Sequence, residues 1–286
     1  MIGGGITRRG LLAGIGATAV LPTFPARALP LEKIRAAGVL RIAVYRDFEP
    51  WAWYEGTKLV GIDVEIGAAI AQKLGVRPEF RDFLAGEDVD EDLRNIVWKG
   101  PATGGTLSDI MMHVPVDRTF ALRNDRVVIT GPYYREGFAL GCDRRVIDCE
   151  LPPPQYKGRK LAAELDSIPD FYLSGSFGGV LRGDVTHMTS GMAALDAVRE
   201  GKSEVAMATR AQVEHAIAKG GDALIERKGP LPALTSPGWD IGVAVKDDSR
   251  DLGDRLETLI PELIADKTIP NIFQKYGVTP RAPLAS

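Results

Sequence analysis

The sequence predicts an α/β protein whose chain forms two lobes. Segments with β-strand character alternate with segments of helical periodicity, a pattern typical of parallel sheets covered by helices. Two Gly/Pro-containing segments, 131–136 and 229–238, are expected to carry the chain from one lobe to the other and back, and two crossovers suit hinge closure around a ligand. We therefore expect lobe 1 at residues 29–131 plus 238–286 and lobe 2 at residues 132–237.

The first part of lobe 1 is expected to contain three strands and the helices that follow them. Its opening strand, Leu40 to Tyr45, comes after a short helical stretch and feeds a loop rich in aromatic residues. Gly61 precedes a run with apolar residues at helical spacing, and Gly75 ends it. The other elements expected here are strands at 77–83 and 107–113 and a helix at 93–98.

The second lobe repeats this alternation, and the chain then returns to lobe 1. The elements expected in lobe 2 are strands at 137–141, 159–164 and 205–208 and a helix at 192–200. The returning section is expected to form a strand at 239–245, an amphipathic helix at 252–265 and a short helix through Tyr276.

Residues 1–28 have the pattern of an export signal. Arg8 and Arg9 precede an apolar run, Leu11 to Leu21, that is shorter than the roughly 20 residues of a membrane-spanning helix. Ala26-Arg27-Ala28 supplies the small residues of a cleavage site, and the arginine pair resembles a twin-arginine signal. We expect a mature protein that begins near Leu29, resides in the periplasm and has no membrane span.

Charge and cysteine content exclude several classes of function. Removing residues 1–28 leaves 258 residues with 32 basic and 38 acidic side chains, so the net charge is −6 and nucleic acid is not an expected partner. The two cysteines, Cys142 and Cys149, favour a disulfide because the chain is exported. The histidines have no zinc-site spacing, so neither a metal nor a required cofactor is expected.

Three groups of residues give the chain its resemblance to a known family. They are Pro50-Trp51-Ala52-Trp53 before Gly61-Ile62-Asp63-Val64, Val116-Asp117-Arg118 before Thr130-Gly131-Pro132-Tyr133, and Lys275-Tyr276-Gly277. In this order they resemble the periplasmic solute-binding proteins of the polar amino acid type (family 3), over the whole mature chain. The resemblance implies a type II-like two-lobed periplasmic binding protein fold. It also implies a protein that catalyses no reaction and delivers a small ligand to an ABC transporter permease.

The resemblance also implies binding residues in lobe 1. The family uses an arginine to clamp the ligand carboxylate, which suits a planar guanidinium. Arg118 is the candidate because it directly follows the expected strand end, and Arg123 is its rival because it keeps the usual distance to Pro132. The family also places an aromatic residue over the ligand, so Trp51 and Trp53 are candidates, although each taken singly fits a core position equally well.

Three further candidates lie in lobe 2. Asp166 and Ser167 occur where the family presents hydroxyl and backbone amide groups to a carboxylate, but both are also ordinary helix N-cap residues. Thr209 ends a strand at which amino-acid binders of the family carry an aspartate that pairs with the ligand ammonium. Losing that partner is costly for a buried charge, so an ordinary α-amino acid is not the expected ligand.

A narrower resemblance concerns two segments, 92–100 and 109–117. Trp98-Lys99-Gly100 and His113-Val114-Pro115 are similar to segments of binding proteins associated with quinoprotein dehydrogenases, including the J proteins of methanol oxidation and carriers of pyrroloquinoline quinone. This similarity implies a small anionic ligand, with pyrroloquinoline quinone as a candidate, and a quinoprotein dehydrogenase as a candidate partner. A quinone ligand agrees with the presence of Thr209 in place of the aspartate of amino-acid binders, because pyrroloquinoline quinone has no α-ammonium group.

Other functions stay open at this stage. An amino-acid ABC transporter binding protein is the first alternative, and a dehydrogenase partner with a vestigial cleft is another. A binding-protein fold turned enzyme, like the periplasmic cyclohexadienyl dehydratases, would need a general acid or base, for which Glu136 beside the hinge is the candidate. No Ser-His-Asp or metal constellation accompanies Glu136, so we expect a binding protein.

Overall fold

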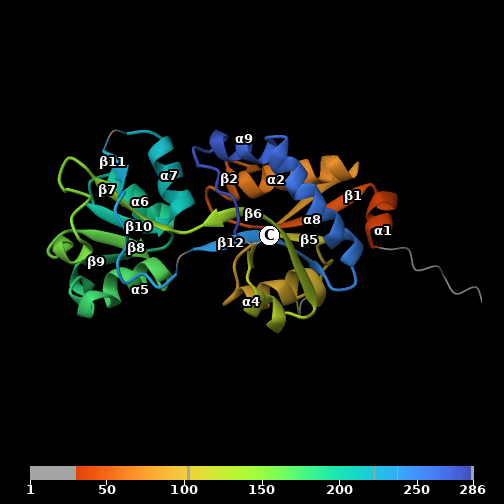
Figure 1. Cartoon of the computed structure of the whole chain (residues 1–286), viewed down its shortest axis with the longest axis horizontal. Coiled ribbons are helices and arrows are strands. Elements are labelled where there is room, and N and C mark those ends of the chain that lie inside the picture. The colour runs from red at the N-terminus through yellow and green to blue at the C-terminus, as the bar shows by residue number, and fades with distance from the viewer. Residues whose placement is uncertain (1–29, 102–103, 222, 237, 285–286) are drawn as a thin grey trace, which may run out of the picture.

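The protein forms two α/β lobes that lie side by side and are joined by two extended segments (Figure 1). The structure is a computed structural model that describes residues 30–101, 104–221, 223–236 and 238–284. The expected export signal, residues 1–28, lies outside the described residues. The architecture confirms the predicted two-lobed binding protein fold.

Lobe 1 is built on a five-stranded sheet. The strand order is β4 (Arg77–Phe83), β1 (Val39–Tyr45), β5 (Ile110–Val116), β12 (Trp239–Lys246) and β6 (Val127–Glu136). Strands β4, β1 and β5 are parallel, whereas β12 runs antiparallel to both of its neighbours. Strand β6 consequently points in the same direction as β4, β1 and β5, and β12, which enters from the opposite lobe, is the one strand of this sheet that departs from the predicted parallel arrangement.

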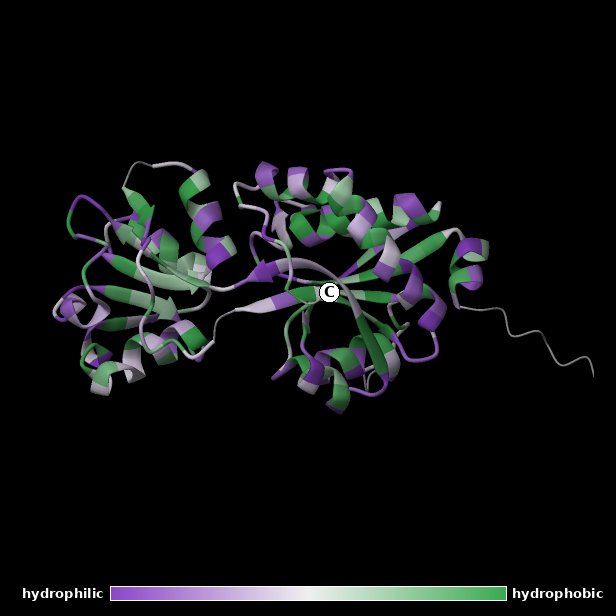
Figure 2. Cartoon of the chain, in the orientation of Figure 1, coloured by the Kyte–Doolittle hydropathy of each residue, from purple (hydrophilic) through white to green (hydrophobic). Residues whose placement is uncertain are grey.

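Helices cover both faces of the lobe 1 sheet, and its strands are largely apolar (Figure 2). A large core cluster joins one face to helices that include α2 (Ile62–Leu74), α8 (Arg250–Ala265) and α9 (Thr268–Lys275). A smaller cluster lies on the other face. The remaining elements of the lobe are α1 (Pro30–Ala37), the hairpin β2 (Trp53–Glu55) and β3 (Lys58–Val60), α3 (Val89–Leu93), the π-helix η1 (Arg94–Trp98) and α4 (Arg118–Arg123).

Lobe 2 has a second five-stranded sheet. Its order is β11 (Leu224–Glu226), β7 (Phe138–Asp143), β10 (Val205–Thr209), β8 (Leu161–Glu164) and β9 (Val185–Met188). Helices α6 (Gly191–Arg199) and α7 (Arg210–Ala218) pack against one face. The other face carries α5 (Ile168–Gly175) and the 3-10 helices η2 (Pro153–Tyr156), η3 (Phe177–Gly179) and η4 (Arg182–Asp184).

The two crossovers run next to each other. The chain leaves lobe 1 after Glu136 and returns at Trp239, and these two residues pair in the antiparallel ladder of β6 and β12. Residues 132–136, expected in lobe 2, extend β6 instead, and Pro132 is tolerated there because β6 is an edge strand. Gly238 has φ 103°, and a Cβ at this position would lie 2.2 Å from the Glu136 carbonyl oxygen, so the close approach of the crossovers requires glycine.

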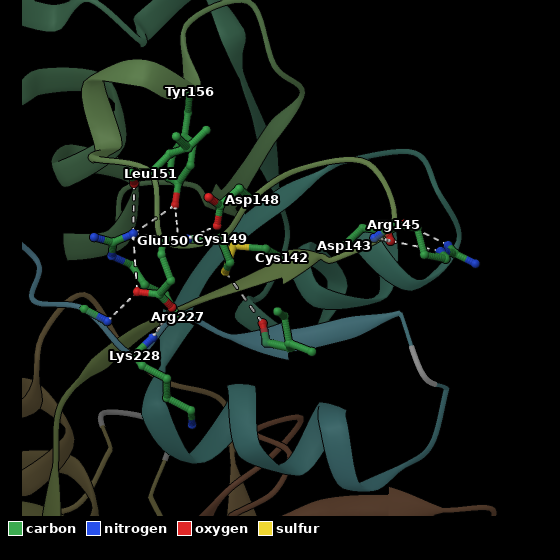
Figure 3. The surroundings of a disulfide bond; sticks show 12 residues. Cys142, Asp143, Arg145, Asp148, Cys149, Glu150, Leu151, Tyr156, Arg227 and Lys228 are labelled. Atoms are coloured by element: carbon green, nitrogen blue, oxygen red, sulfur yellow. Dashed lines mark hydrogen bonds and ion pairs between the residues drawn. A yellow bond between two sulfur atoms is a disulfide. The ribbon is translucent and has the colours of Figure 1, made fainter.

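The predicted disulfide between Cys142 and Cys149 is confirmed (Figure 3). It closes a short loop at the end of β7, and both cysteines are buried. The Tyr156 hydroxyl donates to the Cys149 carbonyl oxygen at 2.6 Å, and Arg227 Nη1 donates to the same oxygen at 2.6 Å. The bridge therefore fastens the loop to the apolar core of lobe 2.

Replacing both cysteines, as Cys142→Ala with Cys149→Ala, is expected to lower the free energy of unfolding by about 2 kcal/mol, a low value for a disulfide because the closed loop is short. Calorimetric unfolding of the two proteins measures the difference. The unmodified protein in reductant is the control and should approach the variant. An unchanged midpoint in the variant would show that the bridge does not stabilise the lobe.

Candidate functional site

Two adjoining cavities lie between the lobes, at the ends of strands from both sheets. One, of about 400 Å³, is lined mainly by residues 45–48 and 85–92 of lobe 1 and reaches Glu164 of lobe 2. The other, of about 300 Å³, lies between the loop after β1 and residues of lobe 2 that include Glu164, Ser190 and Gln212. Both contain Phe48 and Glu164, so we treat them as one interlobe cleft.

A tight turn after β1 places Phe48 in the cleft. The Phe48 N–H donates to the Ala52 carbonyl at 2.8 Å, and its own carbonyl accepts from Trp51 N–H at 2.7 Å. The ring packs edge-on against His113, with centroids 4.9 Å apart. His113 is held in turn by Asp63 through Nδ1 at 3.1 Å. Phe48 is partly buried and lines both cavities, so it offers an aromatic surface to a ligand.

The charged lining of the cleft is mostly acidic. Its basic member, Arg46, already forms an ion pair with Asp82 at 2.7 Å. Its carboxylates come from both lobes and from distant parts of the sequence; they are Asp47, Glu49, Glu87, Asp88, Asp92 and Glu164. A cleft of this charge attracts cations and repels anions.

Two of these carboxyls are partly removed from solvent. Asp92 accepts from the Tyr45 hydroxyl at 2.8 Å and from the Gly86 N–H at 2.9 Å, and burial raises the pKa of its carboxyl. Glu164, on the facing lobe, accepts from the Gly191 N–H at 3.0 Å, and burial raises its pKa as well. A cation between the lobes would stabilise the ionised form of both groups.

Helix α7 of lobe 2 is fastened to lobe 1 beside the cleft. The Glu49 carboxylate lies 2.8 Å from His215 Nε2 and 2.8 Å from Lys219 Nζ. His215 Nδ1 lies 2.6 Å from the Tyr276 carbonyl, and Arg281 forms an ion pair with Glu214 at 2.5 Å. These contacts occupy Glu49, which therefore contributes less to ligand attraction than the cleft carboxylates that have no basic partner.

The two predicted tryptophans occupy different environments. Trp51 is fully buried in lobe 1, where its ring packs against Tyr134 at 5.4 Å and Phe273 at 5.9 Å. Trp51 precedes β2 and lies in a turn, so strand alternation does not place it beside Trp53. Trp53 is partly exposed and lines the smaller cavity. Of the aromatic side chains after β1, Phe48 and Trp53 line the cleft and Trp51 does not.

The two predicted arginines lie outside both cavities. Asp117 caps α4 by accepting from the Phe120 N–H at 2.8 Å, and Phe120 fills the buried position of that helix. Arg118, at the first helical position, is consequently exposed. Arg123 forms an ion pair with Asp90 at 3.0 Å on the surface of lobe 1. Neither guanidinium contributes to the lining of the cleft.

Two of the three predicted residues of lobe 2, Ser167 and Thr209, act as helix caps. The Ser167 hydroxyl accepts from the Asp170 N–H at 3.2 Å at the start of α5, and Asp166 beside it is exposed. Thr209 caps α7 through a reciprocal pair with Gln212, whose side chain lines the smaller cavity. Of this group, Gln212 is the residue that reaches the cleft, and sequence analysis did not select it.

Glu136 lies at the first crossover and is fully buried. Its Oε1 accepts from Gly137 N–H at 2.8 Å and from Ala211 N–H at 3.4 Å, whereas Oε2 has no partner in the described part of the chain. Burial raises the pKa of this carboxyl to about 7. Glu136 lines neither cavity of the cleft, so its placement does not suit a general acid or base acting on a ligand there.

Part of the chain is similar to a known protein family. Residues 40–95 match the model of the bacterial extracellular solute-binding proteins, family 3. A search of curated proteins found no match. Among the described residues, no helix is long and apolar enough to cross a membrane, and no group of three or more His, Cys, Asp or Glu side chains is placed to hold a metal ion.

Solved structures share the fold. An ancestral cationic amino acid solute-binding protein is 17% identical with a TM-score of 0.67, covering 86% of this chain and 99% of its own. An amino acid ABC transporter substrate-binding protein from Streptococcus pneumoniae, bound to L-arginine, is 20% identical with a TM-score of 0.61, covering 87% and 98%. The BvgS VFT2 domain of Bordetella pertussis is 16% identical with a TM-score of 0.59, covering 86% and 97%. None of these comparisons supports the narrower quinoprotein-associated branch.

The Trp51→Ala variant is expected to lose about 3–5 kcal/mol of stability, because it empties a fully buried position in lobe 1. Denaturant unfolding measures the loss. Trp53→Ala is the matched control and should lose less than half as much, because its ring is partly exposed. Equal losses would contradict the assignment of Trp51 to the core.

Glu136 gives the protein a pH-dependent stability. The pKa of its carboxyl is raised in the folded state, so folding favours the protonated form. The contribution of this form to the free energy of unfolding is complete below about pH 4.5 and is lost as the pH rises through about 7. Glu136→Gln keeps the acceptor at Oε1 and removes the titration. We expect this variant to be more stable than the parent at pH 8, by on the order of 1–3 kcal/mol, with little difference at pH 5.

Unfolding curves of both proteins from pH 5 to pH 8 test this expectation. Glu55→Gln, on the exposed end of β2, is the control and should follow the parent protein. Parallel curves for the parent and Glu136→Gln would show that Glu136 does not titrate in this range.

Proposed function

We propose that this protein is the binding component of an ABC transporter for a cationic solute, and that it binds this solute without chemical conversion. The observation that carries the proposal is the cleft itself, where carboxylates of both lobes face a space whose arginine is already paired. The match to family 3 and the likeness to amino-acid-binding structures support the transport role. The position of Glu136 outside the cavities supports binding without catalysis.

Charge explains how such a solute would close the lobes. Asp47 and Asp92 lie on lobe 1 and Glu164 on lobe 2, so bringing the lobes together without a counter-ion increases repulsion. Two like charges 4 Å apart cost about 1 kcal/mol in water and about 4 kcal/mol at an effective dielectric of 20. A cation between them converts this cost into attraction, so closure is coupled to binding.

Phe48 is expected to hold the charged end of the solute. A cation over an aromatic face gains about 0.5–1 kcal/mol at exposed sites and about 2 kcal/mol when it is desolvated. Phe48 lies between Asp47 and Glu49 in the sequence and lines both cavities. An ammonium or guanidinium on this ring would remain within the field of the surrounding carboxylates.

The carboxylate clamp expected of amino-acid binders has no counterpart among the residues that line the two cavities. Arg118 and Arg123 lie elsewhere, and Arg46 is paired with Asp82. A solute with a carboxylate would therefore face repulsion that an amine or guanidine without one avoids. Pyrroloquinoline quinone, a tricarboxylate, would face this repulsion most strongly. Of the residues in 92–100 and 109–117, only Asp92 lines either cavity, and it lines the larger one.

Isothermal titration of the mature protein with agmatine and with L-arginine tests the proposal, because the two ligands share a guanidinium and differ chiefly in the α-carboxylate. We expect agmatine to bind at least as tightly as arginine. The double variant Phe48→Ala with Glu164→Gln should weaken the binding of agmatine tenfold or more. Lys33→Gln, at an exposed position of α1 that lines neither cavity, is the control. Saturable binding of pyrroloquinoline quinone, with no response to either cation, would reject the proposal in favour of the quinone carrier.

A further inference from the structure

A cavity of about 470 Å³ lies on lobe 2, away from the residues of the interlobe cleft. Its walls are the beginning of β7 at residues 137–140, the start of α7 at Arg210, and the chain segment from Glu226 to Ser236. The segment folds back along β7, and the Arg227 N–H donates to the Leu140 carbonyl at 2.9 Å. No residue of this wall belongs to either cavity of the cleft.

The charge of this cavity is opposite to that of the cleft. Three basic side chains, Arg210, Arg227 and Lys228, line it together with one acidic side chain, Glu226. Lys228 Nζ neutralises Glu226 through an ion pair of 2.9 Å. Arg227 forms an ion pair of 4.0 Å with Glu150, which is not part of the cavity lining, so Arg210 is the charge that remains to be balanced inside the cavity.

Arg227 is held rigidly and is almost fully buried, with 6% of its side chain exposed. Its Nη1 donates to the carbonyl oxygens of Cys149 at 2.6 Å and Leu151 at 2.8 Å (Figure 3). Nε donates to the Pro230 carbonyl oxygen at 3.4 Å. Nη2 has no protein acceptor within the described residues and lies beside Gly229, where a Cβ would be 2.9 Å from it. The nearest carboxylate oxygen, on Glu150, is 4.0 Å from Nη1.

Arg210 lines the cavity from the start of α7 and is only partly buried. In the described part of the chain its guanidinium forms no hydrogen bond or ion pair, and the buried Glu136 carboxyl beside it is oriented towards the N–H groups of Gly137 and Ala211. Gly137 makes room for the guanidinium, since a Cβ there would lie 2.9 Å from Nη2. The first turn of α7 carries no acidic residue that would balance the charge.

We propose that this cavity binds a small organic anion through Arg210 and Arg227, and that the anion acts on the hinge. The Arg210 guanidinium presents a fork that matches the two oxygens of a carboxylate or a phosphate, and Nη2 of Arg227 supplies one further donor, so these groups are the chemistry that the cavity selects. The volume lies within the range of ordinary small-molecule sites. Gly137 belongs to the first crossover and Ser236 to the second, so a bound anion contacts both connections and changes how readily they bend.

Isothermal titration of the mature protein with citrate and with inorganic phosphate tests the site. We expect saturable binding of at least one of them, weakened tenfold or more in Arg210→Gln. Arg250→Gln is the matched control, because Arg250 is also the first residue of a helix, α8, and is exposed. Tighter binding of citrate assigns a carboxylate ligand, and tighter binding of phosphate assigns a phosphate ligand.

Fluorine NMR of protein labelled with 5-fluorotryptophan tests the action on the hinge. Trp239 lies in the second crossover with its ring centroid 5.0 Å from that of Phe138, which lines the cavity, whereas Trp51 lies in the core of lobe 1. The anion should shift the Trp239 signal, assigned through Trp239→Phe, and leave the Trp51 signal in place. Absence of saturable binding, equal binding by Arg210→Gln and the parent, or an unmoved Trp239 signal would each overturn the proposal.

Discussion

The antiparallel pairing of Glu136 with Trp239 is the constraint on which the rest of the structure depends. It holds the two crossovers side by side at the junction of the lobes. Gly238 permits the approach, and the Glu136 carboxyl joins the crossover to the start of α7 through the Ala211 N–H. The strand ends of the two sheets consequently face each other across a cleft.

The two sides of the hinge differ in their charge and in their contacts between the lobes. The cleft gathers carboxylates from both lobes, while α7 is fastened to lobe 1 by Glu49 and by the C-terminal segment around Tyr276. The fastened side can serve as a pivot, and the acidic side as the part that opens and closes. The cavity beside Arg210 carries the opposite charge and touches both crossovers, which places an anion where it would influence the pivot.

Sequence patterns predicted the fold and the disulfide because both depend on local or compositional signals. Most of the expected strands and helices form, some with shifted ends, and Cys142 and Cys149 are close in the sequence. The antiparallel β12 was missed because its direction depends on where the chain re-enters lobe 1. The core position of Trp51 was one of two open alternatives, because the turn before β2 interrupts the strand alternation that would have placed it beside Trp53.

The candidate site was harder to predict. Asp47, Asp92 and Glu164 are far apart in the sequence, and each alone resembles an ordinary surface carboxylate; only folding brings them to one cleft. Arg118 followed an expected strand end, but the cap formed by Asp117 turns α4 so that Phe120, not Arg118, faces the interior. The side of a short helix that faces the interior depends on the residues that pack against it, which sequence periodicity over six residues cannot specify.

The most direct test of the account is the interlobe distance, measured by double electron–electron resonance between spin labels at the exposed positions Leu84 in lobe 1 and Phe171 in lobe 2. If the acidic cleft closes on a cation, agmatine will shorten this distance. In the spin-labelled Glu164→Gln variant, the distance will be partially shortened without any ligand, because one repelling charge is gone. A distance that agmatine leaves unchanged and that pyrroloquinoline quinone shortens would contradict the central claim.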